Sequence, residues 1–251
     1  TYKEKTESLK AKIKKALTYP IAVIVVSVVV TGILLVKVVP TFAETFTGFG
    51  AELPSFTLFV LHLSEAAQEW WLIWLISIIG AFFVFREARR RSAKFNALVD
   101  KYSLKIPIVG DIMYQAIIAR FARTLSTTFA AGVPLVDALN SVAGAAGNAV
   151  YRDATLSVRD DVTTGIQLNQ ALRATGKFPV LLLQMASIGE ESGALDEMLE
   201  KAAEHYEEAV DNAVDNLTTL LEPMIMAVLG VLVGGLLIAM YLPIFKLGAV
   251  I

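Results

Sequence analysis

Three long apolar runs constrain this chain more than any other feature of its sequence. They cover Pro20–Val39, Trp70–Phe85 and Pro223–Leu242. A helix needs about 20 mainly apolar residues to cross the roughly 30 Å hydrocarbon core of a bilayer. Lys37 is the one charged residue in these runs, and it lies close enough to an end for its side chain to reach the headgroups. We therefore expect three membrane-spanning helices, in a chain with 55% hydrophobic and only 18% charged residues.

The basic residues beside these runs indicate how the chain crosses the membrane. Lysines and arginines crowd residues 3–15 and 86–94, whereas residues 41–69 contain neither. Cytoplasmic flanks carry the excess of Lys and Arg, so both basic segments are expected in the cytoplasm and residues 41–69 outside it. The tryptophans at 70, 71 and 74 would then form an aromatic belt at the outer interface, with packing inside a core as the alternative.

Together these features divide the chain into seven expected segments. In order, they are the cytoplasmic end of an upstream repeat unit, a first membrane helix, a periplasmic loop, a second membrane helix, a cytoplasmic helical-bundle domain, a third membrane helix and a periplasmic tail. Their ranges are 1–18, 19–42, 43–69, 70–86, 87–215, 216–243 and 244–251. The expected fold is all-α, with three transmembrane helices and one six-helix bundle.

The first and third apolar runs resemble each other in one gapless register. Pro20 and Pro40 fall on Pro223 and Pro243, and Gly32 falls on Gly235. Such a repeat indicates that residues 1–42 end one structural unit and residues 86–245 form most of a second. We expect the cytoplasmic domain of the first unit to precede residue 1, so that this sequence is a fragment of a longer protein.

Residues 86–215 show helical periodicity throughout. Ile118, Phe121 and Leu125 make one apolar stripe, and Arg120 and Arg123 fall on another face. Gly132 is expected to end that helix, and Pro134 to occupy the first position of the next. Further helices are expected over 149–164, after Asn169 as a cap, over 179–193, and from 194 onward.

The last of these helices has no predicted end before the membrane. There is neither Gly nor Pro between Gly193 and Pro223, so it could run into the third span and transmit a push or a turn from the bundle. Residues 100–215 hold nine basic against sixteen acidic residues. This acidic surface is either a solvated helix face or a docking surface for a basic partner.

Three glycines in the third apolar run form a pattern typical of helix packing in lipid. Gly230 and Gly234 are four residues apart, with Gly235 beside them. Small residues at this spacing let two helices approach closely, within one chain or between chains, although glycine is also common in membrane helices by chance.

The residues of common catalytic sites are missing. Cysteine is absent, and the sequence around Gly176-Lys177 departs from a phosphate-binding loop because Phe178 follows. Glu190 and Glu191 are adjacent on a helix and point about 100° apart, which disfavours joint acid–base catalysis and leaves only a weak case for a cation site. We expect no enzyme activity, no catalytic, cofactor or metal residues, and no nucleic-acid partner.

Several motifs in the right order resemble the secretion-system F-protein (GspF/PilC) family. The matching segments are Ala119–Leu125, Ala131–Leu135, Thr164-Gly165, Phe178-Pro179, Gly189–Leu195 and Leu221–Pro223. The outer segment Gly48–Pro54 is similar to the pilus branch more than to the type II secretion branch. The candidate motif residues, with either a structural or a partner-contact role, are Arg120, Arg123, Gly132, Pro134, Gly189, Glu190, Glu191 and Gly193.

The resemblance implies a multi-pass inner-membrane platform protein of type IV pilus assembly. It implies two homologous six-helix cytoplasmic domains, and as partners a cytoplasmic hexameric ATPase, pilin transmembrane helices, other inner-membrane assembly proteins and further copies of the chain. The alternatives are a type II secretion platform, a small transporter or channel subunit, and a membrane-tethered enzyme. The transporter is disfavoured because no ionisable residue lies in the middle of a span.

Overall fold

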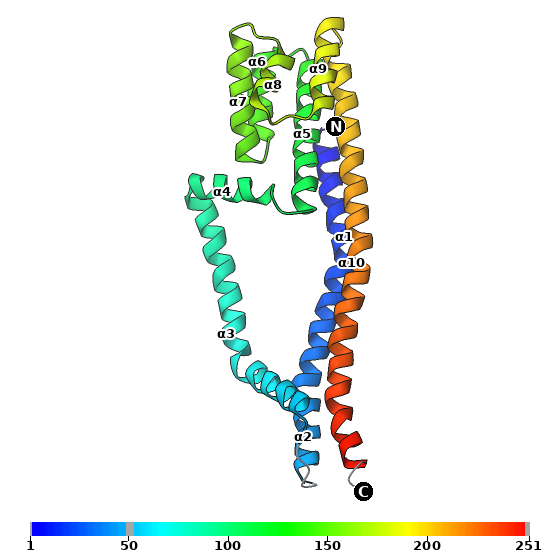
Figure 1. Ribbon diagram of the computed structural model, residues 1–251. Coiled ribbons are helices and arrows are strands. Elements are labelled where there is room, and N and C mark those ends of the chain that lie inside the picture. The colour runs from blue at the N-terminus through cyan, green and yellow to red at the C-terminus, as the bar shows by residue number, and fades with distance from the viewer. Residues whose placement is uncertain (1, 49–52, 249–251) are drawn as a thin grey trace. The chain divides into compact units, whose positions relative to one another are not determined.

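The computed structural model describes residues 2–48 and 53–248, and in that part of the chain every regular element is a helix (Figure 1). The elements are α1 (Tyr2–Ile33), the π-helix η1 (Leu34–Val38), α2 (Val39–Gly48), α3 (Ser55–Arg91), α4 (Ala93–Ser103), α5 (Val109–Ala130), α6 (Leu135–Ala145), α7 (Ala149–Thr163), α8 (Leu168–Thr175), α9 (Val180–Ser192) and α10 (Leu195–Gly248). The prediction of an all-α fold is confirmed.

Three helical segments are long and apolar enough to cross a membrane, as predicted. They are Thr18–Thr45, Ser55–Arg91 and Leu195–Pro243. The expected loop over 43–69 is largely helical, because α2 continues to Gly48 and α3 already begins at Ser55. That α3 starts so early has a local reason: the side chains of Thr57, Val60 and Ser64 are buried, so this half of the helix has packing of its own. Part of the predicted tail 244–251 and the motif around Gly50 lie outside the described residues.

By its contacts the chain separates into two compact units. The bundle unit comprises residues 1–14 and 88–217, and the membrane unit comprises residues 15–87 and 218–251. Each is described by itself.

The bundle unit has a continuous apolar core, with α5 at its centre. From Ile117 to Ser126 every residue of α5 except Arg120 is buried, and Leu139, Leu172 and Leu199 are fully buried against it. A helix covered on all sides must be the central element of a bundle. The predicted stripe of Ile118, Phe121 and Leu125 therefore belongs to a wider buried surface than the periodicity indicated.

Turn residues separate the bundle helices at or near the predicted positions. Gly132 has φ 80° directly after α5, a conformation that glycine adopts without strain. Pro134 is the residue before α6 rather than its first residue, since its ψ of 143° is extended. Gly193, with φ 74°, ends α9.

An aromatic cluster joins α5, α7 and the segment before α9. The ring of Phe178 lies 4.7 Å from that of Phe121 and 5.8 Å from that of Tyr151, measured between centroids. Tyr151 donates a hydrogen bond from its hydroxyl to the Lys177 carbonyl at 3.1 Å. Burial raises the pKa of Tyr151, so the hydroxyl stays protonated and remains a donor.

The membrane unit is held by a small apolar cluster and a few polar contacts. Its buried apolar side chains are Val39, Val60, Leu236 and Ala239. Thr57 donates from its hydroxyl to the Ala239 carbonyl at 2.8 Å, and Ser64 donates to the Leu35 carbonyl. Leu35 lies in η1, where the wider π-turn displaces carbonyl groups from the regular helical pattern. These bonds attach the first half of α3 to η1 and to α10.

Candidate functional site

A largely buried charged contact of the bundle centres on Arg123 of α5. Arg123 donates to both carboxylate oxygens of Glu207, through Nε at 2.8 Å and Nη2 at 3.0 Å, and through Nη1 to Glu200 at 3.0 Å. Its side chain is only 8% exposed, and that of Glu207 is 18% exposed. Hydrogen bonding to Glu207 raises the pKa of Arg123 against the opposing effect of burial. This fork fixes the rotation of α10 against α5 within the bundle.

Arg123 thus differs from the sequence expectation, which placed it on a face away from the core. Sequence alone could not find its partners, because Glu200 and Glu207 lie far along the chain and only the tertiary fold brings them together. Arg120 is half-buried, and its guanidinium lies directly against Gly147, so a larger residue at 147 would require the Arg120 side chain to shift. The two arginines of the motif therefore lie in different surroundings.

The motif over residues 189–195 forms a tight corner between α9 and α10. A methyl group on Gly189 would lie 2.7 Å from the Cα of Leu195, so only glycine permits this approach. Gly193 allows the left-handed turn between the two helices. Both glycines have geometric roles inside the bundle.

Glu190 caps the start of α8 from a different helix. Its carboxylate accepts hydrogen bonds from the backbone N–H groups of Leu168 and Asn169, the latter at 3.0 Å. A negative charge at a helix N-terminus is favoured by the helix dipole and by the unpaired N–H groups of the first turn. The expectation that Asn169 itself caps α8 is wrong, because Glu190 takes that role and the Asn169 side chain donates to Ser187 instead.

Glu191 points elsewhere, as the spacing predicted. It accepts a hydrogen bond from the Ser187 hydroxyl at 3.2 Å. Among the described residues no three His, Asp or Glu side chains group as they would to hold a metal ion. Glu190 therefore joins α9 to α8, whereas Glu191 bonds within its own helix.

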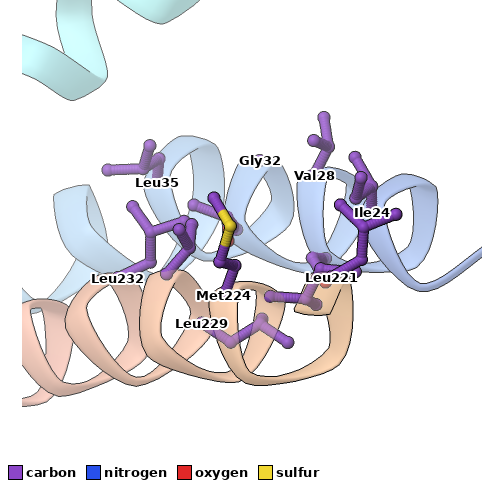
Figure 2. A pocket seen from close by; sticks show the side chains of 12 residues that line it. Ile24, Val28, Gly32, Leu35, Leu221, Met224, Leu229 and Leu232 are labelled. Carbon is purple, nitrogen blue, oxygen red and sulfur yellow. The ribbon is translucent and has the colours of Figure 1, made fainter. Parts of the chain in front are cut away.

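An apolar groove of about 560 Å³ opens between α1 with η1 and α10 in the membrane unit. Figure 2 shows the lining side chains gathered between the two helices. Its wall includes Ile24, Val28 and Gly32 on one side and Met224, Leu229 and Leu232 on the other. Ser27 and Thr31 are the polar residues that line it, and the Ser27 hydroxyl donates to its own helix. The groove can accept an apolar chain or helix.

The glycine pattern of the third span lies outside this groove. A methyl group on Gly230, Gly234 or Gly235 would meet nothing within 4 Å in the described part of the chain, apart from nearby backbone of its own helix. No close approach within the chain therefore uses them there. Their role in packing between chains stays a prediction.

Comparison with known proteins places these features in a family. The family model described as Type II secretion system (T2SS), protein F, matches residues 121–243. The Type IV pilus assembly protein PilC of Pseudomonas aeruginosa is 63% identical over 251 residues, which are 100% of this chain and 67% of that protein. The Type IV pilus assembly protein TapC of Aeromonas hydrophila is 55% identical over 99% of this chain and 60% of its own length.

A secretion protein is similar at a lower level. The Type II secretion system protein F of Pseudomonas aeruginosa is 33% identical over 100% of this chain and 62% of that protein. The chain thus spans about two thirds or less of the length of these relatives. With its helical bundle, its three membrane-length helices and the motif at 189–195, the chain belongs to the type II secretion system F-protein family and is PilC-like within it.

Proposed function

We propose that this chain is part of a non-enzymatic inner-membrane platform for type IV pilus assembly, which couples a cytoplasmic hexameric ATPase to the extraction and polymerisation of pilin. The observation that carries the proposal is the 63% identity to a Type IV pilus assembly protein along the whole chain. The bundle faces the cytoplasm and the C-terminus the periplasm, and the platform is a homo-oligomer among other inner-membrane assembly proteins.

The apolar groove supports a role in receiving pilin. A pilin transmembrane helix leaving the lipid needs an apolar surface, and the groove wall is almost wholly aliphatic. Gly32 lines this groove and a methyl group on it would meet nothing within 4 Å, so Gly32→Leu places an aliphatic side chain in the groove. Gly80→Leu in α3 adds the same side chain where a methyl group also meets nothing, and serves as the control.

Piliation of cells that carry each variant tests this role. We expect Gly32→Leu to reduce surface pili sharply while Gly80→Leu leaves them near the unsubstituted level. Because the chain has no cysteine, a single Val28→Cys can also be tested for crosslinking to pilin in cells. Normal piliation of Gly32→Leu, together with no crosslink from position 28, would refute the role of the groove.

The acidic face of α10 supports contact between the bundle and the ATPase. Glu204 and Glu208 are exposed there, one helical turn apart. A basic surface on the ATPase would be attracted to such a field. A crosslink from Glu204→Cys to the ATPase in piliated cells is the expected result, with Leu72→Cys in α3 as the control. Absence of the crosslink in cells that still form pili would refute this contact.

The continuity of α10 supports a mechanical role. The helix is uninterrupted from Leu195 to Gly248, with Pro223 and Pro243 inside it. We expect a Gly-Ser insertion near Asn212 to abolish piliation while the bundle stays folded. Normal piliation of that variant would show that α10 does not transmit the force.

A secretion platform is the second candidate, favoured by the 33% identity to a Type II secretion system protein F. Expression of the gene in one strain that lacks its pilus platform and in another that lacks its secretion platform distinguishes the two candidates. We expect restoration of pili and no restoration of secretion. Rescue of secretion alone would reverse the assignment.

A further inference from the structure

α4 and the turn after it carry an exposed face that mixes cations with apolar groups. We call the following residues the α4 face: Lys94, Leu98, Lys101, Tyr102, Lys105 and Ile108. Lys94, Leu98 and Lys101 are spaced by four and three residues, so they line one side of α4, and Lys105 and Ile108 follow in the turn after it. Leu98 is 54% exposed and Tyr102 is 63% exposed, which is unusual for a helix packed on a soluble bundle.

The opposite side of α4 is committed to the bundle. Asp100 is buried and accepts a hydrogen bond from the backbone N–H of Ala149 at 2.9 Å, at the start of α7. Leu104, just past the helix, packs against the core. These contacts fix which side of α4 is turned outward, so the exposure of the α4 face is a property of the fold.

The turn after α4 holds further apolar residues outward at a cost in backbone strain. Ile108 has φ 68° and ψ −58°, the only positive φ of a non-glycine residue in the described chain. Val109 donates its N–H to the Pro107 carbonyl at 2.8 Å, which makes residues 107–109 a γ-turn of the rare, strained form. Ile108 is nevertheless left exposed. A strained backbone that presents an apolar side chain to the outside points to a partner at that surface.

α4 follows directly after the basic C-terminal end of α3. Only Ser92 separates the two helices, and its hydroxyl caps α4 by accepting from the Phe95 N–H. Arg89, in the last turn of α3, donates to the Asn96 side chain at 3.0 Å and to Asp100 at 3.1 Å. A membrane-spanning helix that ends in arginines is followed within one residue by α4, so α4 starts at the edge of the bilayer.

The charge of this segment matches an anionic lipid surface. Residues 89–109 contain six cations and one carboxylate, Asp100, which is already bonded to Arg89 and Ala149. Lys105 lies with its Nζ 5.8 Å from the ring centroid of Tyr102, the arrangement of a cation beside an interfacial aromatic ring. Residues 110–215, which follow this segment, hold seven basic against fifteen acidic residues, so the α4 face differs in charge from the helices after it.

We propose that the α4 face rests on the bilayer surface and binds the headgroups of anionic phospholipids in the leaflet where the basic end of α3 emerges. Leu98, Tyr102 and Ile108 would enter the boundary between headgroups and acyl chains, and the three lysines would contact the phosphates. This contact anchors the bundle at its first helix, independently of any pilin or ATPase.

The absence of cysteine permits a direct test on the purified full chain in lipid nanodiscs. Leu98→Cys carries an environment-sensitive fluorophore, and Val180→Cys, at an exposed apolar position of α9, is the matched control. Quenching by a spin-labelled lipid reports contact with the bilayer, and quenching by iodide reports contact with water. With phosphatidylglycerol present, we expect lipid quenching at position 98 to exceed that at position 180 by about threefold or more.

The charge dependence tests which part of the lipid is bound. Lys94→Gln, Lys101→Gln and Lys105→Gln together should lower lipid quenching at position 98 to that seen in phosphatidylcholine, whereas the three Lys→Arg changes should preserve it. Hydrogen exchange of residues 149–158 verifies that the α4–α7 contact is intact. Equal water exposure at positions 98 and 180, or lipid contact that ignores both lipid charge and the lysines, would overturn the proposal.

Discussion

The bundle unit and the membrane unit use apolar side chains in opposite ways. In the bundle unit a set of large aliphatic residues is fully buried in the core, Leu125 and Leu139 among them, whereas Val231 of the membrane unit is 76% exposed. Lipid solvates such side chains as well as a protein core does, so the membrane unit gains little from burying them against itself. Internal packing and charge pairs therefore stabilise the bundle, while a few hydrogen bonds and the bilayer hold the spans.

The largest expected effect comes from breaking the charge fork of the bundle. Arg123→Ala removes the buried guanidinium that donates to the carboxylate of Glu207, and loss of one partner of a buried pair costs about 3–5 kcal/mol. Arg152→Ala is the control, because Arg152 is 55% exposed and pairs with exposed Asp153, where about 0–1 kcal/mol is expected. Denaturant unfolding of the chain in detergent, followed by hydrogen exchange of α5, measures both. Equal losses of unfolding free energy in the two variants would contradict a stabilising role for the buried contacts of Arg123.

The corner between α9 and α10 gives the next effect. Gly189→Ala forces a methyl group against the Cα of Leu195, and overpacking of this kind costs about 1–3 kcal/mol. Gly144→Ala, in α6, adds the same group where nothing lies within 4 Å and should stabilise by about 0.4–1 kcal/mol. Thermal unfolding of the two variants should therefore shift in opposite directions. A shift of the same sign in both would show that the corner can relax.

Glu190 and Glu191 offer a matched pair with a smaller difference. Glu190→Gln removes the charge that caps α8 and should cost about 1 kcal/mol, the usual contribution of a helix cap. Glu191→Gln alters an exposed side chain bonded to Ser187 and should change stability by less than about 0.5 kcal/mol. The hydrogen-exchange rates of the backbone amides of Leu168 and Asn169 report directly on the cap. Faster exchange in both variants, or in neither, would argue against this division of roles.

Much of this fold could be predicted because its signals are local. Apolar length marks the spans, helical periodicity marks the stripe of Ile118 and Leu125, and Gly132 and Gly193 mark helix ends through their own conformational freedom. Each of these depends on a short stretch of sequence, so these features could be predicted closely, whereas the helix of the second span begins at Ser55 rather than near Trp70.

The tertiary roles of charged residues could not be predicted. From the sequence alone, Arg123 is expected on the surface, and Glu190 is expected to be one half of an acidic pair. In the fold, Arg123 donates to Glu207, and Glu190 accepts from the backbone at the start of α8. Nothing in the spacing of 43–69 indicated that Ser64 donates a hydrogen bond to the Leu35 carbonyl or that this segment is largely helical. Helical periodicity carries no information about partners that lie far along the chain, and the predictions failed where such partners determine the structure.

The smallest expected effect tests the membrane half of the comparison. Ser64→Ala removes the hydrogen bond to Leu35, and such bonds between membrane helices contribute about 0.6 kcal/mol on average and at most about 1.7. Ser77→Ala, at an exposed position of the same helix, is the control. All three tryptophans lie on α3, so their fluorescence during unfolding in mixed micelles reports this unit. A cost near that of Arg123→Ala would mean that the membrane unit depends on internal polar contacts as strongly as the bundle does. A cost of about 1 kcal/mol or less is the expected result, because lipid solvates the apolar surface of this unit and the Ser64 hydrogen bond adds only a small share to its stability.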